Sequence, residues 1–178
     1  MSRSATRTYS KGEKITRDVL EKIFELEFPN KRPPFNVNPL TGHQLELDCY
    51  NEELGLAVEV NGRQHYEYVK RFHKDPIGFF YQQFKDEIKE FQCEVNDIVF
   101  LTVPYTIEEE DIEPYIIALL INTRFVADAA KYIDEYYGLD ILTNDVLKAI
   151  ATNMGISGGK TKSEIVANIR RELNNINF

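Results

Sequence analysis

Two carboxylates interrupt two neighbouring runs of residues that otherwise have the pattern of buried β-strands. The first run, residues 43–50, alternates apolar and polar side chains and contains Asp48. The second run, residues 56–61, reads LAVEVN and carries Glu59 among apolar neighbours. A charge in a buried strand is costly unless it is paired or bound to a metal ion. These two acids therefore restrict what the chain can fold around.

The residues between the two runs, NEELG, have the composition of a turn, so the runs predict a β-hairpin. A hairpin can bring Asp48 and Glu59 within reach of one cation. Hard oxygen ligands of this kind select Mg²⁺ or Mn²⁺. Such an ion can activate water and neutralise charge that develops on a phosphate. The same carboxylates can also face water or pair with a lysine, and the residues leave both interpretations open.

Helix signals lie on both sides of the predicted hairpin. Ser10 and Glu13 have the spacing of a capping box, and apolar residues follow at helical period. Residues 79–95 predict a second helix, and the apolar run 97–103 predicts a third strand. The apolar stripe of the second helix consists of Phe80, Phe84, Ile88, Phe91 and Val95. Its opposite side carries Gln82, Lys85, Asp86 and Lys89. This alternation of helices and strands predicts an α/β fold.

Composition narrows the class of protein. Of the 178 residues, 43% are hydrophobic and 28% are charged, which is typical of a soluble globular protein. No apolar run approaches the roughly 18 residues of a membrane span, and the N-terminus lacks the apolar centre of a secretory signal. Cys49 and Cys93 have no metal-type spacing, which favours a reducing, intracellular setting. We expect no membrane partner, no small-molecule cofactor and a disordered segment over residues 1–9.

The net charge of −8 is distributed unevenly. Residues 1–44 and 141–178 are net basic, and the residues between them are strongly acidic. Proteins that cut nucleic acids concentrate carboxylates at a metal site and place cations around it. An ordinary solvated surface produces the same asymmetry, so the charge pattern is compatible with a nuclease without requiring one.

The stretch LELDCYNEELGLAVEVNGRQHYEY, residues 45–68, resembles the PD-(D/E)XK nuclease superfamily, in the branch where Gln replaces the usual Lys. It is most similar there to virus- and phage-type restriction-endonuclease-like proteins related to the very-short-patch-repair nucleases. The resemblance covers residues 10–107 and includes SKGE, KRPPF, NPLTG and VPYTI. It implies a restriction-endonuclease-like core, with a mixed central sheet flanked by helices, over residues 10–138.

The resemblance also implies roles for single residues. Asp48 and Glu59 match the two acidic metal ligands, and the Val60 carbonyl would lie beside the metal. Gln64 matches the residue that orients the attacking water or contacts the scissile phosphate. Because Gln is neither a cation nor a base, water activation must then depend on the metal and solvent. Asn61 stands where the superfamily usually has Lys, which departs from the common pattern.

Other candidate site residues could instead have a purely structural role. Glu13 matches an acid of the first helix that completes many such metal sites, and a capping box explains the same residue. His65 resembles the QH pair of the related nucleases, whereas a lone His is more often structural. Lys85 and Lys89 lie one turn apart and form either a solvated face, a phosphate contact or a relocated catalytic Lys. The remaining candidates for DNA contact are Asn61, Arg63 and Arg71.

The C-terminal residues 141–175 resemble SAP-like helix-extension-helix modules, which bind DNA. We expect a small all-α module over residues 139–178, in which the N-terminus of the second helix offers N–H groups to a phosphate. Its candidate DNA-binding residues are Lys148, Lys160, Lys162, Arg170 and Arg171. A two-helix packing element without a ligand is the alternative.

Taken together, the motifs and the resemblance imply a Mg²⁺- or Mn²⁺-dependent DNA endonuclease, virus- or phage-encoded and acting in the host cell. It would leave a 5′-phosphate and a 3′-hydroxyl on a duplex site, a nicked or mismatched duplex, or a branched junction. A homodimer would be needed to cut both strands in one encounter. A non-catalytic DNA-binding protein on a nuclease-like fold is the alternative that Asn61 keeps open. A zinc module would use Cys49, Cys93, His43, His65 and His73, which lack ligand spacing.

Overall fold

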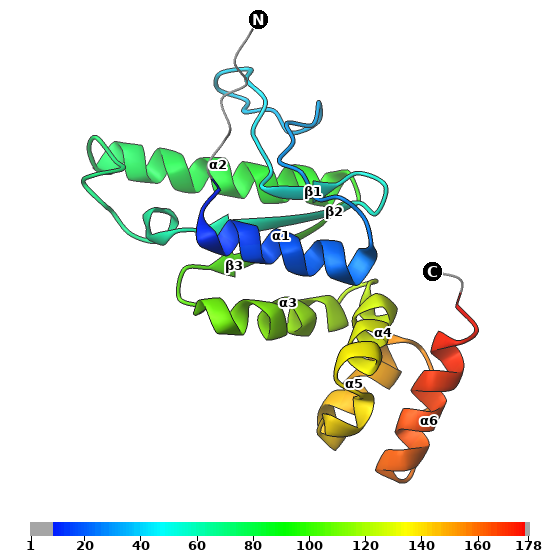
Figure 1. Ribbon diagram of the computed structural model, residues 1–178. Helices are drawn as coiled ribbons and strands as arrows, with labels where there is room; N and C mark the ends of the chain where they lie inside the picture. Colours follow the sequence, from blue (N-terminus) through cyan, green and yellow to red (C-terminus); the bar gives the residue numbers. More distant parts are fainter. Residues whose placement is uncertain (1–8, 177–178) are drawn as a thin grey trace, which may run out of the picture. The chain divides into compact units, whose positions relative to one another are not determined.

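A three-stranded mixed sheet forms the centre of the N-terminal half of the chain (Figure 1). Its strands are β1 (Cys49–Asn51), β2 (Leu56–Asn61) and β3 (Val99–Pro104), in the order β1-β2-β3. β1 and β2 form the predicted antiparallel hairpin, and β3 runs parallel to β2. The computed structural model describes residues 9–176, so the predicted disordered segment lies outside the described residues except for Tyr9.

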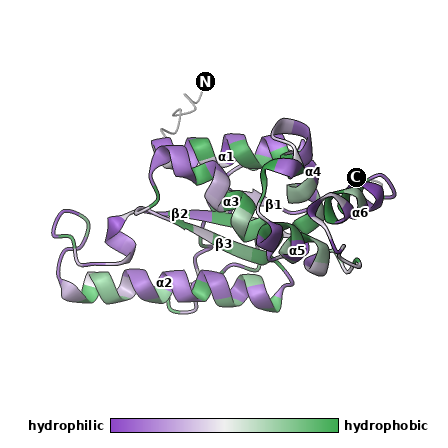
Figure 2. Cartoon of the chain, turned by 90° about the horizontal axis from the view of Figure 1, so that it is seen from below, coloured by the Kyte–Doolittle hydropathy of each residue, from purple (hydrophilic) through white to green (hydrophobic). Residues whose placement is uncertain are grey.

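Two long helices enclose this sheet, with α1 (Lys11–Phe24) on one side and α2 (Pro76–Val95) on the other, as Figure 2 shows. The predicted start of α1 is confirmed, because the Ser10 hydroxyl accepts a hydrogen bond from the Glu13 N–H at 3.1 Å. α2 begins earlier than the sequence pattern indicates. Asp75 caps it and Pro76 occupies its first turn, where the missing N–H costs nothing.

The strand predicted over residues 43–50 is wrong for most of its length. Regular pairing with β2 begins only at Cys49. Leu47 pairs instead with Lys31 in an isolated antiparallel bridge, because the preceding proline-containing loop folds back along this segment. The alternating pattern therefore reflects burial of Leu47 against the core, without a continuous strand.

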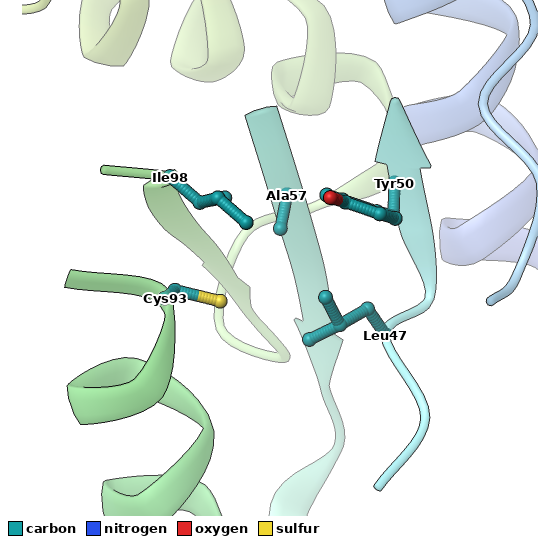
Figure 3. Close-up of a cluster of buried hydrophobic side chains, with 5 residues drawn as sticks. All are labelled: Leu47, Tyr50, Ala57, Cys93 and Ile98. Atoms are coloured by element: carbon teal, nitrogen blue, oxygen red, sulfur yellow. The ribbon is translucent and has the colours of Figure 1, made fainter. Parts of the chain in front are cut away.

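A small apolar cluster joins the hairpin to α2 and to the start of β3 (Figure 3). Its members are Leu47, Tyr50, Ala57, Cys93 and Ile98. Phe35 and Phe100 pack against it at the edge. The cluster ties the C-terminal end of α2 to the hairpin and thereby sets where the rest of that helix lies.

α2 turns its apolar stripe away from the sheet. Phe80 and Phe91 are 64% and 58% exposed, and Cys93 is the one buried residue of the helix. Figure 2 shows hydrophilic and hydrophobic bands alternating along α2. An amphipathic helix normally buries its apolar side. Here the polar side, with Asp86 and Lys89, is the side that faces β2 and the residues after it.

The chain divides into two compact units between Glu113 and Pro114. The remaining helices are α3 (Ile112–Ile121), α4 (Val126–Tyr136), α5 (Asn144–Asn153) and α6 (Lys162–Leu173). Short 3₁₀ helices are η1 (Arg63–His65), η2 (Glu109–Asp111) and η3 (Leu139–Ile141). None of the helices within residues 9–176 has the length and apolar character needed to cross a membrane.

In the C-terminal unit, α5 and α6 pack on each other and on α4. The unit therefore includes α4 as well as the helical module that the sequence sets apart over residues 139–178. Thr161 and Glu164 form a complete capping box at the start of α6. Arg170 on α6 pairs with Asp134 on α4, which fastens the two helices together.

The outward stripe of α2 makes a test of stability. We expect Phe91→Ala to change the free energy of unfolding by less than about 1 kcal/mol, because most of the ring already contacts water. Leu47→Ala, which empties a fully buried position, should cost about 2–5 kcal/mol. Urea unfolding followed by circular dichroism measures both. Similar losses for the two variants would contradict the orientation of α2.

Candidate active site

Asp48 and Glu59 lie side by side at one end of the hairpin. Because Cys49 pairs with Val58, Asp48 and Glu59 occupy the next opposing positions of the two chains. The Asp48 N–H donates to Glu59 Oε1 at 3.0 Å, and the Val60 N–H donates to Asp48 Oδ2 at 3.3 Å. Each carboxylate is thus held by the backbone of the opposite segment. The structure brings together the two acids that the sequence pattern singles out.

Lys89 of α2 supplies a positive charge to this pair of acids. Its Nζ lies 2.5 Å from Glu59 Oε2, and the two side chains are only 13% and 3% exposed. A buried ion pair of this kind is expensive to break, because either partner left alone is an uncompensated charge. The polar side of α2 therefore faces the sheet for an electrostatic reason.

The protonation of the three groups follows from their burial. Burial raises the pKa of Glu59 to about 7, and the charge of Asp48 adds to the rise while Lys89 opposes it. Burial also raises the pKa of Asp48, against the opposing charge of Lys89. Burial works to lower the pKa of Lys89, but the charge and hydrogen bond of Glu59, together with the charges of Asp48 and Asp86, leave that pKa above its usual value. Two acids thus share one cation, and a further proton or cation is needed for neutrality.

Behind Asp48, α1 contributes a second polar layer. Arg17 Nη2 donates to the Asp48 carbonyl oxygen at 2.9 Å and to Asn30 Oδ1 at 2.7 Å. Asn30 in turn donates to the buried Glu13 carboxylate at 2.9 Å, and Arg17 pairs with the same carboxylate. Glu13 is close enough to raise the pKa of Asp48, but its Oε1 is occupied by Asn30. The sequence analysis missed Arg17, whose position four residues after Glu13 is the usual spacing of a helical ion pair.

His65 belongs to a separate hydrogen-bonded group at the start of the β2–α2 connection. Its Nδ1 lies 2.7 Å from Asp86 Oδ2, and Gln82 donates to Asp86 Oδ1 at 2.9 Å. This contact fixes the orientation of the imidazole ring and leaves Nε2 on the other side of it. η1 carries His65, and α2 carries both of its partners.

A polar pocket of about 210 Å³ joins these groups. Its lining includes Glu59, Asn61, His65, Tyr66, Asp86 and Lys89. It also includes two acids of α2, Glu87 and Glu90, and Thr102 of β3, which the sequence analysis did not select. No local motif marks these three residues; only the parallel pairing of β2 with β3 and the orientation of α2 bring them to the pocket.

Gln64 lies at the margin of this arrangement. Its side chain folds back over Gly62, so that a Cβ at Gly62 would meet Gln64 Oε1 at 2.5 Å. A side chain at position 62 would therefore displace this carboxamide from its place over the backbone. Glu59, Asn61, His65 and Lys89 line the pocket and Asp48 adjoins it through Glu59, whereas the carboxamide of Gln64 folds over Gly62.

The other basic residues singled out from the sequence have varied surroundings. Arg63 pairs with Glu67. Lys85 lies over the Tyr81 ring, 5.4 Å from its centroid, and burial lowers its pKa. Arg71 lies 5.8 Å from the centroid of the Phe72 ring.

In the C-terminal unit, the basic residues divide into two groups. Arg170 pairs with Asp134 and Asp140, and its pKa rises because of these hydrogen bonds. Lys162 donates to the Asp140 carbonyl oxygen. The side chains of both residues therefore contribute to the structure of the unit itself. Of the five basic residues named for this unit from the sequence, Lys148, Lys160 and Arg171 are exposed to solvent.

The donor set near Glu59 fits a magnesium ion better than a zinc ion. Within residues 9–176, no three His, Cys, Asp or Glu side chains assemble into a cluster able to hold a metal. Mg²⁺ does not need one, because it is commonly bound through one or two carboxylates and keeps several waters. Burial raises the pKa of both Cys49 and Cys93 to about 12, so neither offers the thiolate that zinc prefers.

No family model matches the chain, and no solved structure matches it. Similar proteins are found in viruses. Uncharacterized protein 033L of Invertebrate iridescent virus 3 is 45% identical over 120 residues, which is 67% of this chain and 62% of the relative. Uncharacterized protein 307L of Invertebrate iridescent virus 6 is 37% identical over 115 residues, 56% of this chain and 58% of the relative. The chain spans about 60% of the length of these two proteins.

A third relative is matched over more of its own length. Uncharacterized protein 094L of Frog virus 3 (isolate Goorha) is 44% identical over 108 residues, which is 60% of this chain and 68% of the relative. All three relatives are viral proteins without an assigned activity. The chain belongs to the family of this uncharacterized frog virus protein.

Proposed function

We propose that the chain is a Mg²⁺- or Mn²⁺-dependent DNA endonuclease that hydrolyses phosphodiester bonds. One observation carries the proposal: the buried Glu59 and the half-buried Asp48, from opposing segments, are held together by backbone hydrogen bonds and share the single charge of Lys89. An acid removed from water is costly unless a cation compensates it, and one lysine compensates only one of these two acids. The resemblance of residues 45–68 to the PD-(D/E)XK superfamily supports the same activity.

In this mechanism Asp48, Glu59 and the Val60 carbonyl would hold the divalent ion. The ion, when bound, polarises the phosphate and lowers the pKa of water. Lys89, whose ammonium lies against Glu59, would neutralise charge on the phosphate oxygens. His65, oriented by Asp86, is placed to donate a proton to the leaving oxygen or to hold the phosphate.

Lys89 also bears on the alternative, a DNA-binding protein without catalytic activity. Asn61 favours that alternative, because it occupies the position where the superfamily usually has Lys. Lys89 of α2 supplies the positive charge that Asn61 of β2 lacks, and its ammonium reaches the carboxylate of Glu59. We therefore prefer an enzyme with a relocated lysine.

The partners follow from the same proposal. DNA would be bound by three exposed cations of the C-terminal unit, Lys148, Lys160 and Arg171, which fits a SAP-like role for α5 and α6. The viral origin of the relatives supports a virus-encoded enzyme that acts in the host cell. A homodimer would allow both strands of a duplex to be cut in one encounter.

Replacing one acid tests the activity directly. Asp48→Asn keeps the size of the side chain and an oxygen to accept from the Val60 N–H, but removes the charge. We expect Mg²⁺-dependent cleavage of linear, nicked and four-way DNA to fall by about a hundredfold or more. Glu52→Gln, an exposed acid paired with Lys31, is the control and should cleave like the wild type. Equal cleavage by Asp48→Asn and the wild type would rule out the enzyme.

Lys89→Met separates the binding of the ion from the chemistry. Methionine fills a similar volume without the charge, so we expect cleavage to fall by about a hundredfold. Mn²⁺ binding, measured by electron paramagnetic resonance at about pH 8.5 so that Glu59 is ionised, should persist. If cleavage survives in Lys89→Met, the lysine is only a structural counter-ion.

The raised pKa of Glu59 predicts how Mn²⁺ binding depends on pH. Below about pH 7 the carboxyl is mostly protonated, so a bound cation must displace a proton. The apparent affinity should therefore rise with pH, by up to about tenfold per unit, and level off above pH 7. Removing the opposing charge with Lys89→Met should move the midpoint to higher pH. An affinity independent of pH between about 5.5 and 8 would contradict this assignment.

A further inference from the structure

The connection between β2 and α2 places exposed aromatic and basic side chains next to one another. We refer to residues 66–75 as the connecting loop; it projects beyond the strands at one end of the N-terminal unit (Figure 1). Its exposed aromatic residues are Tyr66, Tyr68 and Phe72. Its cations are Lys70, Arg71 and Lys74, all exposed. This combination stands out in a chain whose net charge is −8.

The connecting loop is held by an anchor of its own. His73 is buried; its ring Nδ1 accepts from the Val69 backbone N–H at 3.0 Å, and its backbone N–H donates to the Val69 carbonyl oxygen at 2.9 Å. The imidazole stacks on Tyr68, with ring centroids 5.8 Å apart, and contacts Phe79 at 5.3 Å. Because these contacts of His73 hold the connecting loop in place, the exposed side chains of the loop have a defined arrangement.

The three cations are available to a ligand. Within the part of the chain that the structure describes, Lys70, Arg71 and Lys74 form no ion pair, whereas the nearby Arg63 pairs with Glu67. Unpaired cations between exposed rings match a polyanion that also carries flat apolar groups. Nucleic acid with unpaired bases has both properties, because its phosphates attract the cations and its base faces stack on the rings.

We propose that the connecting loop binds an unpaired DNA strand, with bases stacked on Tyr68 and Phe72 and phosphates against Lys70, Arg71 and Lys74. A fully paired duplex fits less well, because its base faces are already stacked on one another. Tyr66 belongs both to this loop and to the lining of the pocket with Glu59, so a bound strand leads into the candidate active site. The inference builds on the proposed nuclease and names its substrate class: DNA with an unpaired segment, such as a flap, a frayed end or an open junction.

Binding measured without a divalent ion tests the loop independently of cleavage. The full chain in EDTA is titrated into fluorescent single-stranded DNA of about 20 nucleotides and into the matching duplex. We expect tighter binding to the single strand. Phe72→Ala should weaken it by about fivefold to a hundredfold, since one stacking contact is lost. Phe91→Ala is the matched control, because Phe91 is 58% and Phe72 59% exposed, and it should bind like the wild type.

The cations give a second measurement. In the triple variant Lys70→Gln, Arg71→Gln and Lys74→Gln, the slope of log affinity against log salt should become shallower by about 2, since each phosphate contact on a single strand contributes about 0.7. An unchanged slope, or equal binding by Phe72→Ala and Phe91→Ala, overturns the inference. So does a wild-type preference for duplex.

These outcomes separate the loop from the activity. Asp48→Asn should keep the preference for the single strand over the duplex, because its change lies at the acids and leaves the connecting loop intact. A chain that binds the strand through the loop but cuts no DNA refutes the nuclease and leaves the loop assignment intact. A chain that cuts DNA while Phe72→Ala binds normally refutes the loop assignment alone.

Discussion

The ion pair between Glu59 and Lys89 is the contact on which the N-terminal unit depends. It joins β2 to α2 in a place nearly closed to water, and breaking such a pair by removing one partner typically costs about 3–5 kcal/mol. The pair also explains why α2 presents a polar side to the sheet. The apolar cluster around Leu47 and Cys93 fastens one end of the helix, and the ion pair orients the remainder.

The same pair lets the fold tolerate two neighbouring acids. Asp48 and Glu59 repel each other, and the backbone N–H groups that hold them offset only part of that repulsion. Lys89 supplies most of the compensation, so the hairpin keeps its register without depending on a divalent ion. If the proposed divalent ion binds, it would take the place of one cation already present, and the protein would not need to refold.

The parts of the fold governed by neighbouring residues could be predicted from the sequence. The hairpin follows from two strand-like runs around a turn, and once those strands pair, Asp48 and Glu59 must face each other. Ser10 marks the start of α1 for an equally local reason. Periodicity, however, defines a stripe on α2 without deciding which side the sheet will cover. That choice depends on Lys89 meeting a carboxylate 30 residues earlier in the chain, and the pairing of Leu47 with the proline-containing loop is similarly non-local.

The outward stripe of α2 has a practical consequence for work on this family. Hydropathy would mark Phe80 and Phe91 as core positions to be left alone, whereas the structure exposes most of both rings, so that replacing them empties no core position. Polar substitutions at these two positions offer a route to more soluble protein for crystallisation and spectroscopy. The charged side of α2 should be left unchanged in such variants. Even a conservative substitution of Asp86 or Lys89 would break a contact with His65 or Glu59.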